Sequence, residues 1–132
     1  SKAGMTSGPA VTWAPSPLQP AAALISEGTG LFSAGVRDLV MKHGKGIIEA
    51  QLPLWRVADA AIDLYAMTAV TSRAAKALED GSHTAQHELL LANTFCEDAI
   101  LRVRDNVKGL SRDAGLDDKM CKLADDIFEA EG

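Results

Sequence analysis

The placement of the prolines constrains the fold of this chain more than any other feature. Four of the five fall in the first twenty residues, SKAGMTSGPAVTWAPSPLQP, and the fifth is Pro53. Proline fixes φ and has no backbone N–H donor, so clustered prolines are incompatible with a helix interior or a central strand. We therefore predict a Pro-rich linker or mobile arm over residues 1–28, in which Trp13 is either a docking anchor or an exposed residue. Residues 29–132 are expected to form the folded domain.

Beyond Gly30, apolar residues recur every three or four positions and β-type alternation is absent, which predicts α-helices. Four are expected, at about residues 29–43, 49–80, 84–109 and 116–129. The glycines of HGKG, Gly81 in EDGS, and Gly109 with the turn-like SRDAG are predicted to separate them. Such helices, joined by short loops, pack most simply as an antiparallel up-down four-helix bundle. The predicted fold class is all-α.

Each predicted helix carries an apolar stripe that is expected to face the core. In the second helix this stripe includes Leu54, Trp55, Ile62 and Tyr65, and in the third it includes Ala92, Cys96, Ala99 and Val103. In the fourth helix the residues expected to point inward are Met120, Leu123, Ala124, Ile127 and Phe128.

The composition narrows the class of function. Thirteen Lys and Arg stand against eighteen Asp and Glu, a formal net charge of -5, and the basic residues are interleaved with acids. This disfavours nucleic-acid binding, which needs a concentrated basic surface. Cys96 and Cys121 are too few for a disulfide framework and are interpreted as small buried hydrophobes in a reducing compartment.

The stretch GSHTAQHELLLANTFCEDAI gathers His83, His87, Glu88 and Cys96. Two histidines four apart can share a helix face and bind zinc, but zinc hydrolases need H-E-x-x-H, and here the glutamate follows the second histidine. The favoured interpretation is a solvated helix start, with Ser82 or Thr84 as N-cap, and no metal ligand is assigned. A free-standing metal-binding bundle is the alternative.

Asp59 and Asp63 lie four apart on the long second helix, and Arg56 precedes them. Paired carboxylates can do acid–base chemistry or hold a cation. They are more often part of a solvated face, or of an ion-paired ridge that meets another domain. No nucleophile or phosphate-loop motif accompanies them, so no catalytic residue is assigned.

Three stretches carry a resemblance: VADAAIDLYAMTAVTSRAAKAL, DGSHTAQHE and LLLANTFCEDAI. In this order they resemble the extra C-terminal helical domain of very-long-chain acyl-CoA dehydrogenase and of its relative, acyl-CoA dehydrogenase family member 9. The resemblance covers roughly residues 31–108. It implies a mitochondrial flavoprotein parent that oxidises long-chain acyl-CoA to trans-2-enoyl-CoA in the first step of fatty acid β-oxidation, with FAD and a glutamate base. Those elements belong to the preceding core, so no catalytic or cofactor residue is carried over and this fragment is expected to be inactive alone.

For the domain itself the resemblance implies a supporting role. It is expected to pack on the dehydrogenase core of the same chain, to help form a homodimer, and to attach peripherally to the matrix side of the inner mitochondrial membrane. The alternative is a protein-interaction module of acyl-CoA dehydrogenase family member 9 that acts in respiratory complex I assembly. The interface candidates are residues of the long helix that we expect to be exposed, namely Arg56, Asp59, Asp63 and Arg73.

Overall fold

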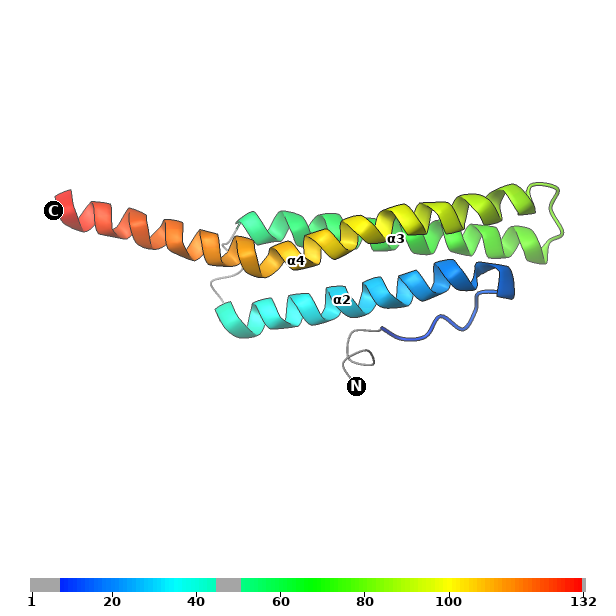
Figure 1. The fold of residues 1–132 in the computed structure, drawn as a ribbon, viewed down its shortest axis with the longest axis horizontal. Helices are drawn as coiled ribbons and strands as arrows, with labels where there is room; N and C mark the ends of the chain where they lie inside the picture. The colour runs from blue at the N-terminus through cyan, green and yellow to red at the C-terminus, as the bar shows by residue number, and fades with distance from the viewer. Residues whose placement is uncertain (1–7, 45–50, 132) are drawn as a thin grey trace.

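The computed structural model describes residues 8–44 and 51–131, and over these ranges the chain is helical, with no strand. A short 3₁₀ helix, η1 (Ser16–Leu18), leads into α2 (Gln19–His43), which is followed by α3 (Gln51–Glu79) and α4 (Ala85–Glu131). Figure 1 shows the three long helices side by side, with the end of α4 continuing past the other two. The predicted all-α class is confirmed.

The first long helix begins ten residues earlier than predicted, at Gln19 rather than Thr29. The sequence argument treated the prolines as excluding a helix, but Pro20 lies in the first turn of α2. A first-turn residue has no intrahelical partner for its N–H, so proline costs nothing there. Leu18, Ala21 and Ile25, which the prediction placed in the arm, are buried. How the chain divides into folding units stays a prediction.

Side chains also tie the start of the chain to the helices. Asn93 of α4 accepts the backbone N–H of Ala21 through Oδ1 at 3.0 Å and donates through Nδ2 to the carbonyl of Pro17 at 3.1 Å. Gly8 N–H donates to the carbonyl of Ser26 at 2.7 Å. These bonds position the segment before α2 against the helices.

Two predicted helix ends are confirmed. α2 ends at His43, and Gly44 follows with φ 57°. α3 ends at Glu79, and Gly81 adopts φ 64°. Around Gly81, the N–H of Ser82 donates to the carbonyl of Ala77 at 3.0 Å, and that of Gly81 to the carbonyl of Leu78 at 3.2 Å. This is the Schellman arrangement, which favours glycine because it needs positive φ.

The predicted break between a third and a fourth helix is wrong. α4 runs without interruption through Gly109 and SRDAG, so the described residues form three long α-helices and not four. A glycine costs a helix interior only about 1 kcal/mol, and no proline forces an end here. The packing of this region, described below, more than offsets that cost.

Small residues bring the three helices close together. The buried core includes Ala21 and Ile25 of α2, Met67 of α3, and Ala92, Cys96, Ala99, Ile100 and Val103 of α4. A Cβ atom on Gly28 of α2 would lie 2.7 Å from Leu64 Cδ2 and 3.2 Å from Ile100 Cδ1. A side chain at this position would therefore require Leu64 to move where α2 meets both other helices.

The stripe predicted for the third helix is buried at Ala92, Cys96, Ala99 and Val103, but the stripes of the second and fourth are not. Leu54, Trp55, Ile62 and Tyr65 are exposed, and α3 buries Ala60, Met67, Thr71 and Ala74 instead. Met120, Leu123, Ala124, Ile127 and Phe128 are exposed as well. Apart from Met67 and Pro53, the buried apolar residues of α3 are alanines, whereas larger side chains such as Trp55 and Ile62 lie on the surface.

Candidate functional site

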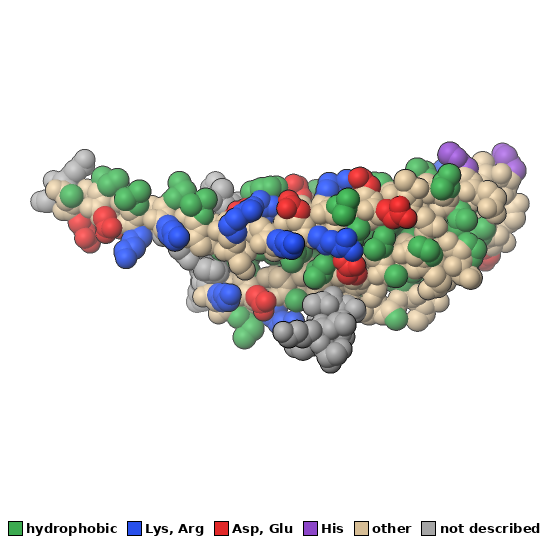
Figure 2. All heavy atoms as spheres, in the orientation of Figure 1, with side chains coloured by type: hydrophobic (Ala, Val, Ile, Leu, Met, Phe, Trp, Pro, Cys, Tyr) green, Lys and Arg blue, Asp and Glu red, His purple; other side chains and the backbone are tan. Residues whose placement is uncertain are grey.

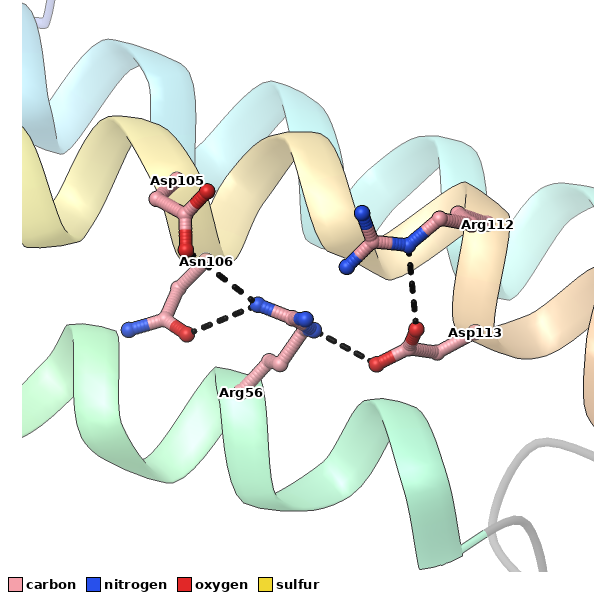
Figure 3. Close-up of polar contacts among 5 residues, drawn as sticks. All are labelled: Arg56, Asp105, Asn106, Arg112 and Asp113. Atoms are coloured by element: carbon pink, nitrogen blue, oxygen red, sulfur yellow. Dashed lines mark hydrogen bonds and ion pairs between the residues drawn. The ribbon is translucent and has the colours of Figure 1, made fainter.

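Arg56 lies in a buried polar cluster between α3 and α4. Its Nε donates to Asp113 Oδ2 at 2.5 Å and its Nη1 donates to Asn106 Oδ1 at 3.2 Å. Asp105 Oδ2 lies 3.8 Å from Nη1, and Figure 3 shows these groups converging on the guanidinium. The Trp55 ring centroid lies 4.6 Å from Cζ. Arg56 is 8% exposed, so the expectation that it is exposed is wrong, whereas its role at an interface stays a prediction.

The Arg56 cluster fixes the charge of Asp113. The hydrogen bond from Arg56 holds the pKa of the Asp113 carboxyl below its usual range, against the opposing effect of burial. Arg112 Nε adds a second contact at 3.4 Å. Asp113 was missed in the sequence because SRDAG resembles a turn. A buried, mutually satisfied set of this kind holds two helices in one register.

Asp63 is bound to α4. Arg102 donates to its carboxylate from Nε at 3.1 and 3.2 Å and from Nη2 at 3.0 Å, and also contacts Asp98. These residues border an open hollow of about 380 Å³ between α3 and α4. The hollow is lined by Trp55, Asp59, Ile62, Asp63, Arg102, Asp105 and Asn106. Two of the four interface candidates, Asp59 and Asp63, therefore line one hollow.

Arg73 lines a second hollow between the same helices. Its Nε donates to Glu88 Oε1 at 2.9 Å, and Val70, His87 and Leu91 complete the lining. Residues 55, 59, 62, 66 and 73 repeat at heptad spacing, so both hollows open on one side of α3. We call the residues that line them the α3–α4 surface.

The residues of the candidate zinc stretch are not brought together. His83 lies in the turn before α4 and His87 in its first turn, and both are exposed. Figure 2 shows histidine side chains at the end of the molecule where α3 turns into α4. Cys96 is buried beside Thr71 Oγ1 at 3.6 Å, and burial raises the pKa of its thiol. Within residues 8–44 and 51–131 no group of three His, Cys, Asp or Glu is placed to hold a metal ion.

Two arginines of α4 are also paired. Arg104 donates to Glu27 of α2 at 2.6 and 2.8 Å, and this hydrogen bonding lowers the pKa of the Glu27 carboxyl. Arg102 is shared by Asp63 and Asp98. Glu27 was missed because the sequence placed it in the arm. The arginines therefore link helices and do not form a free anion-binding patch.

The chemistry of the α3–α4 surface does not fit a flavin dinucleotide. The carboxylates of Asp59, Asp63 and Asp105 would repel a pyrophosphate, and Arg102, the cation beside them, is already bound to two carboxylates. Among the described helices, none is long and apolar enough to cross a membrane. What the surface offers is apolar area rimmed by charge, which suits contact with another protein.

Comparison with known proteins identifies the domain. Residues 16–132 match the family "ACAD9/ACADV, C-terminal domain". The chain belongs to this family. Very long-chain specific acyl-CoA dehydrogenase, mitochondrial, is 48% identical in Macaca fascicularis over 82 residues and 46% identical in Homo sapiens over 82, covering 62% of this chain in both cases. The same-named protein of Rattus norvegicus is 48% identical over 79 residues, or 60% of this chain.

The matched segment is a small part of each relative, 12% of its length. The family match reaches back to Ser16, at the start of η1, and forward through the whole of α4. The resemblance seen in the sequence over about residues 31–108 is thereby confirmed and extended at both ends.

Proposed function

We propose that this chain is the non-catalytic C-terminal domain of a mitochondrial, FAD-dependent very-long-chain acyl-CoA dehydrogenase, in which it packs on the dehydrogenase core. The observation that carries the proposal is the family match over residues 16–132, together with relatives named as very long-chain specific acyl-CoA dehydrogenases. In this proposal the flavin and the acyl-CoA bind to the core, and this domain supports the fold and the assembly of the enzyme. The relatives named above are very long-chain specific acyl-CoA dehydrogenases, which favours this function over a role in complex I assembly.

The α3–α4 surface is the part of the domain that we assign to the core. Trp55 and Ile62 are 47% and 65% exposed there, which supplies apolar area for burial. Asp59 and Arg73 are exposed at its rim, and Asp63 is the partly buried partner of Arg102. Charges at a rim set orientation more than affinity. Arg56 contributes indirectly in this assignment, by fixing α3 against α4 beneath Trp55.

The arrangement of the helices supports such a supporting role. Arg73 meets Glu88, Asp63 meets Arg102, and Arg56 meets Asp113, so residue numbers rise along α3 as they fall along α4. We propose on this basis that the helices form an antiparallel bundle. A bundle with ion pairs along its length is a rigid body, and a rigid body can hold a second domain in one position.

A chimera tests the proposal. The matched segment of the Rattus norvegicus relative is replaced by residues 16–132 of this chain, and a second protein lacks the segment altogether. We expect the chimera to have the acyl-CoA dehydrogenase activity and the melting temperature of the intact relative. The shortened protein should lose activity and melt at a lower temperature, because the exposed core surface destabilises it. If the shortened protein kept the activity and melting temperature of the intact relative, the supporting function would be wrong.

Two matched substitutions test the assigned surface within the chimera. Ile62→Asp puts a charge on the α3–α4 surface, whereas Tyr65→Asp puts one on an α3 residue that is 78% exposed and lines neither hollow. We expect only Ile62→Asp to lower the melting temperature of the chimera, since a buried unpaired carboxylate is costly. Neither should change the helicity of the isolated chain. Equal effects of the two would contradict the assignment.

Dimerisation of the parent and its attachment to the matrix side of the inner mitochondrial membrane complete the proposal. The relatives are named as mitochondrial, and the net charge of -5 disfavours adsorption of this chain alone to anionic lipid. In flotation with vesicles of phosphatidylcholine, phosphatidylethanolamine and cardiolipin, we expect the chimera to float and the isolated chain not to. If the shortened protein floated as well as the chimera, this domain would have no part in attachment.

A further inference from the structure

The last part of α4 lies beyond the packed bundle. We call residues 115–131 the α4 extension, and Figure 1 shows this end of the helix projecting past α2 and α3. Leu110 and Ala114, which are 2% and 1% exposed, are the last buried apolar side chains described on α4. From Leu116 onward, every described side chain is exposed. The extension therefore has no packing partner among the described residues.

The extension carries one narrow apolar stripe. Leu116, Met120, Leu123 and Ile127 are 50%, 57%, 61% and 53% exposed, and they follow one another at intervals of four, three and four residues. This is the a/d spacing of a coiled coil, in which one helix packs along a single partner helix. Figure 2 shows hydrophobic side chains gathered along the projecting end.

The α4 extension would gain stability from a partner. Short helices are marginal in water, and most of their stability in proteins comes from packing an amphipathic face. A lipid surface is a poor partner, since interfacial helices are rich in Lys and Arg, whereas residues 115–131 contain two lysines and six acids. The chemistry favours another helix.

The charges beside the stripe are self-complementary. Lys119 and Asp126 are both exposed and lie seven residues apart, so they share one edge of the stripe. If two copies pack with their extensions antiparallel, Met120 lies opposite Leu123 and Leu116 opposite Ile127. In that register Lys119 of each copy meets the partner's Asp126, so the two-fold symmetry forms the same pair twice. Parallel packing would place Lys119 against Ala124 and would form neither pair.

We propose that the α4 extension binds the same segment of a second copy of this chain as an antiparallel two-helix coiled coil. The inference deepens the dimerisation part of the proposed function, and its relevance to the parent enzyme rests on that function. The acids Asp125 and Glu129 lie away from the stripe and are exposed to solvent, where salt screens their charges. Their mutual repulsion across the pair is therefore screened.

Sedimentation equilibrium of the full 132-residue chain tests the proposal. Two 17-residue helices bury less than the roughly 1,200 Å² of a stable complex, so we expect a reversible dimer with a Kd on the order of 100 μM. The apparent mass should rise from 13.9 kDa towards twice that value as the concentration increases. A mass that stays monomeric up to about 1 mM, ten times the expected Kd, would overturn the proposal.

Matched variants locate the contact. Leu123→Glu places a carboxylate in the centre of the stripe and should keep the chain monomeric. Its helicity by circular dichroism should match that of the unmodified chain well below the Kd, where both chains are monomers. Phe128→Glu alters a side chain that is 74% exposed but lies outside the stripe, and it should leave the dimer intact. If Leu123→Glu dimerised like the unmodified chain, or if both variants lost the dimer, the stripe would not be the contact.

Charge exchange tests the orientation. Lys119→Asp places like charges together twice in the antiparallel dimer and should raise the Kd by roughly tenfold. Adding Asp126→Lys to the same chain reverses both pairs and should restore the original Kd. A double variant that dimerises as weakly as Lys119→Asp would rule out the antiparallel pairing.

Vesicle binding tests the alternative partner. If the chain were monomeric and bound vesicles, and if Leu123→Glu abolished that binding, the stripe would be assigned to lipid and the proposal would be overturned. If the chimera kept its activity while the isolated chain stayed monomeric, this inference would be wrong and the proposed function would stand.

Discussion

Gly109→Ala offers the sharpest test of how α3 and α4 are held together. Gly109 lies in the interior of α4, where alanine is normally the better residue. Here the added methyl group would lie 2.6 Å from Arg56 Cδ and would overlap Cζ and Nε as well. The guanidinium would have to leave Asp113 and Asn106, and the Arg56 cluster would be broken.

Two opposing effects decide the outcome. Replacing glycine by alanine in a helix interior stabilises by about 1 kcal/mol. Separating a buried ion pair, and so leaving Asp113 without its cation, costs about 3–5 kcal/mol. The second effect is larger, so we expect Gly109→Ala to reduce the free energy of unfolding by about 2–4 kcal/mol.

The assay is urea denaturation followed by circular dichroism. Gly115→Ala is the matched control, because a Cβ atom there meets nothing within 4 Å, and it should stabilise the chain by about 1 kcal/mol or less. In an Arg56→Ala background the cost of Gly109→Ala should disappear, since the overlapping side chain is gone. If Gly109→Ala were as stable as the unmodified chain, the account of the Arg56 cluster would be refuted.

Three further predictions concern other parts of the bundle. A thiol reagent at pH 8 should modify Cys121 rapidly and Cys96 only in denaturant, because Cys96 is buried and its pKa is raised; two fast thiols would contradict this. Glu27→Gln should cost about 1 kcal/mol or less at pH 7 through loss of the pair with Arg104. The pKa of Glu27 is lowered in the folded chain, so the pair with Arg104 contributes to stability above the ordinary pKa of 4.5 and stops contributing as the pH falls through the folded pKa. The free energies of unfolding of Glu27→Gln and of the unmodified chain, measured against pH, should therefore converge in acid. Gly28→Ala should destabilise by about 1–3 kcal/mol in the same urea assay by overpacking the contact between helices, and an unchanged midpoint would show that α2 can shift.

The sequence by itself determined the all-α class, the long helix over most of residues 51–79, and the glycine-based ends at Gly44 and Gly81. These features depend on local rules of spacing, backbone conformation and capping, which act within a few residues. The family resemblance was also visible in the sequence, because uncommon short stretches such as IDLYAM occur in the same order as in the family. The buried stripe of Ala92, Cys96, Ala99 and Val103 was predicted for the same reason.

Only the tertiary structure decided where helices begin and continue, and which faces they bury. A helix begins around Pro20 because Leu18 and Ile25 are buried in the core. α4 continues through Gly109 because Arg56 packs against that glycine. Trp55 and Leu123 are apolar at helical spacing, yet both are exposed. α3 buries other residues in place of Trp55, and no described element packs on the α4 extension around Leu123. Whether a stripe is covered depends on elements distant in the sequence. A local pattern reports that a face is apolar, and only the packed chain determines what covers it.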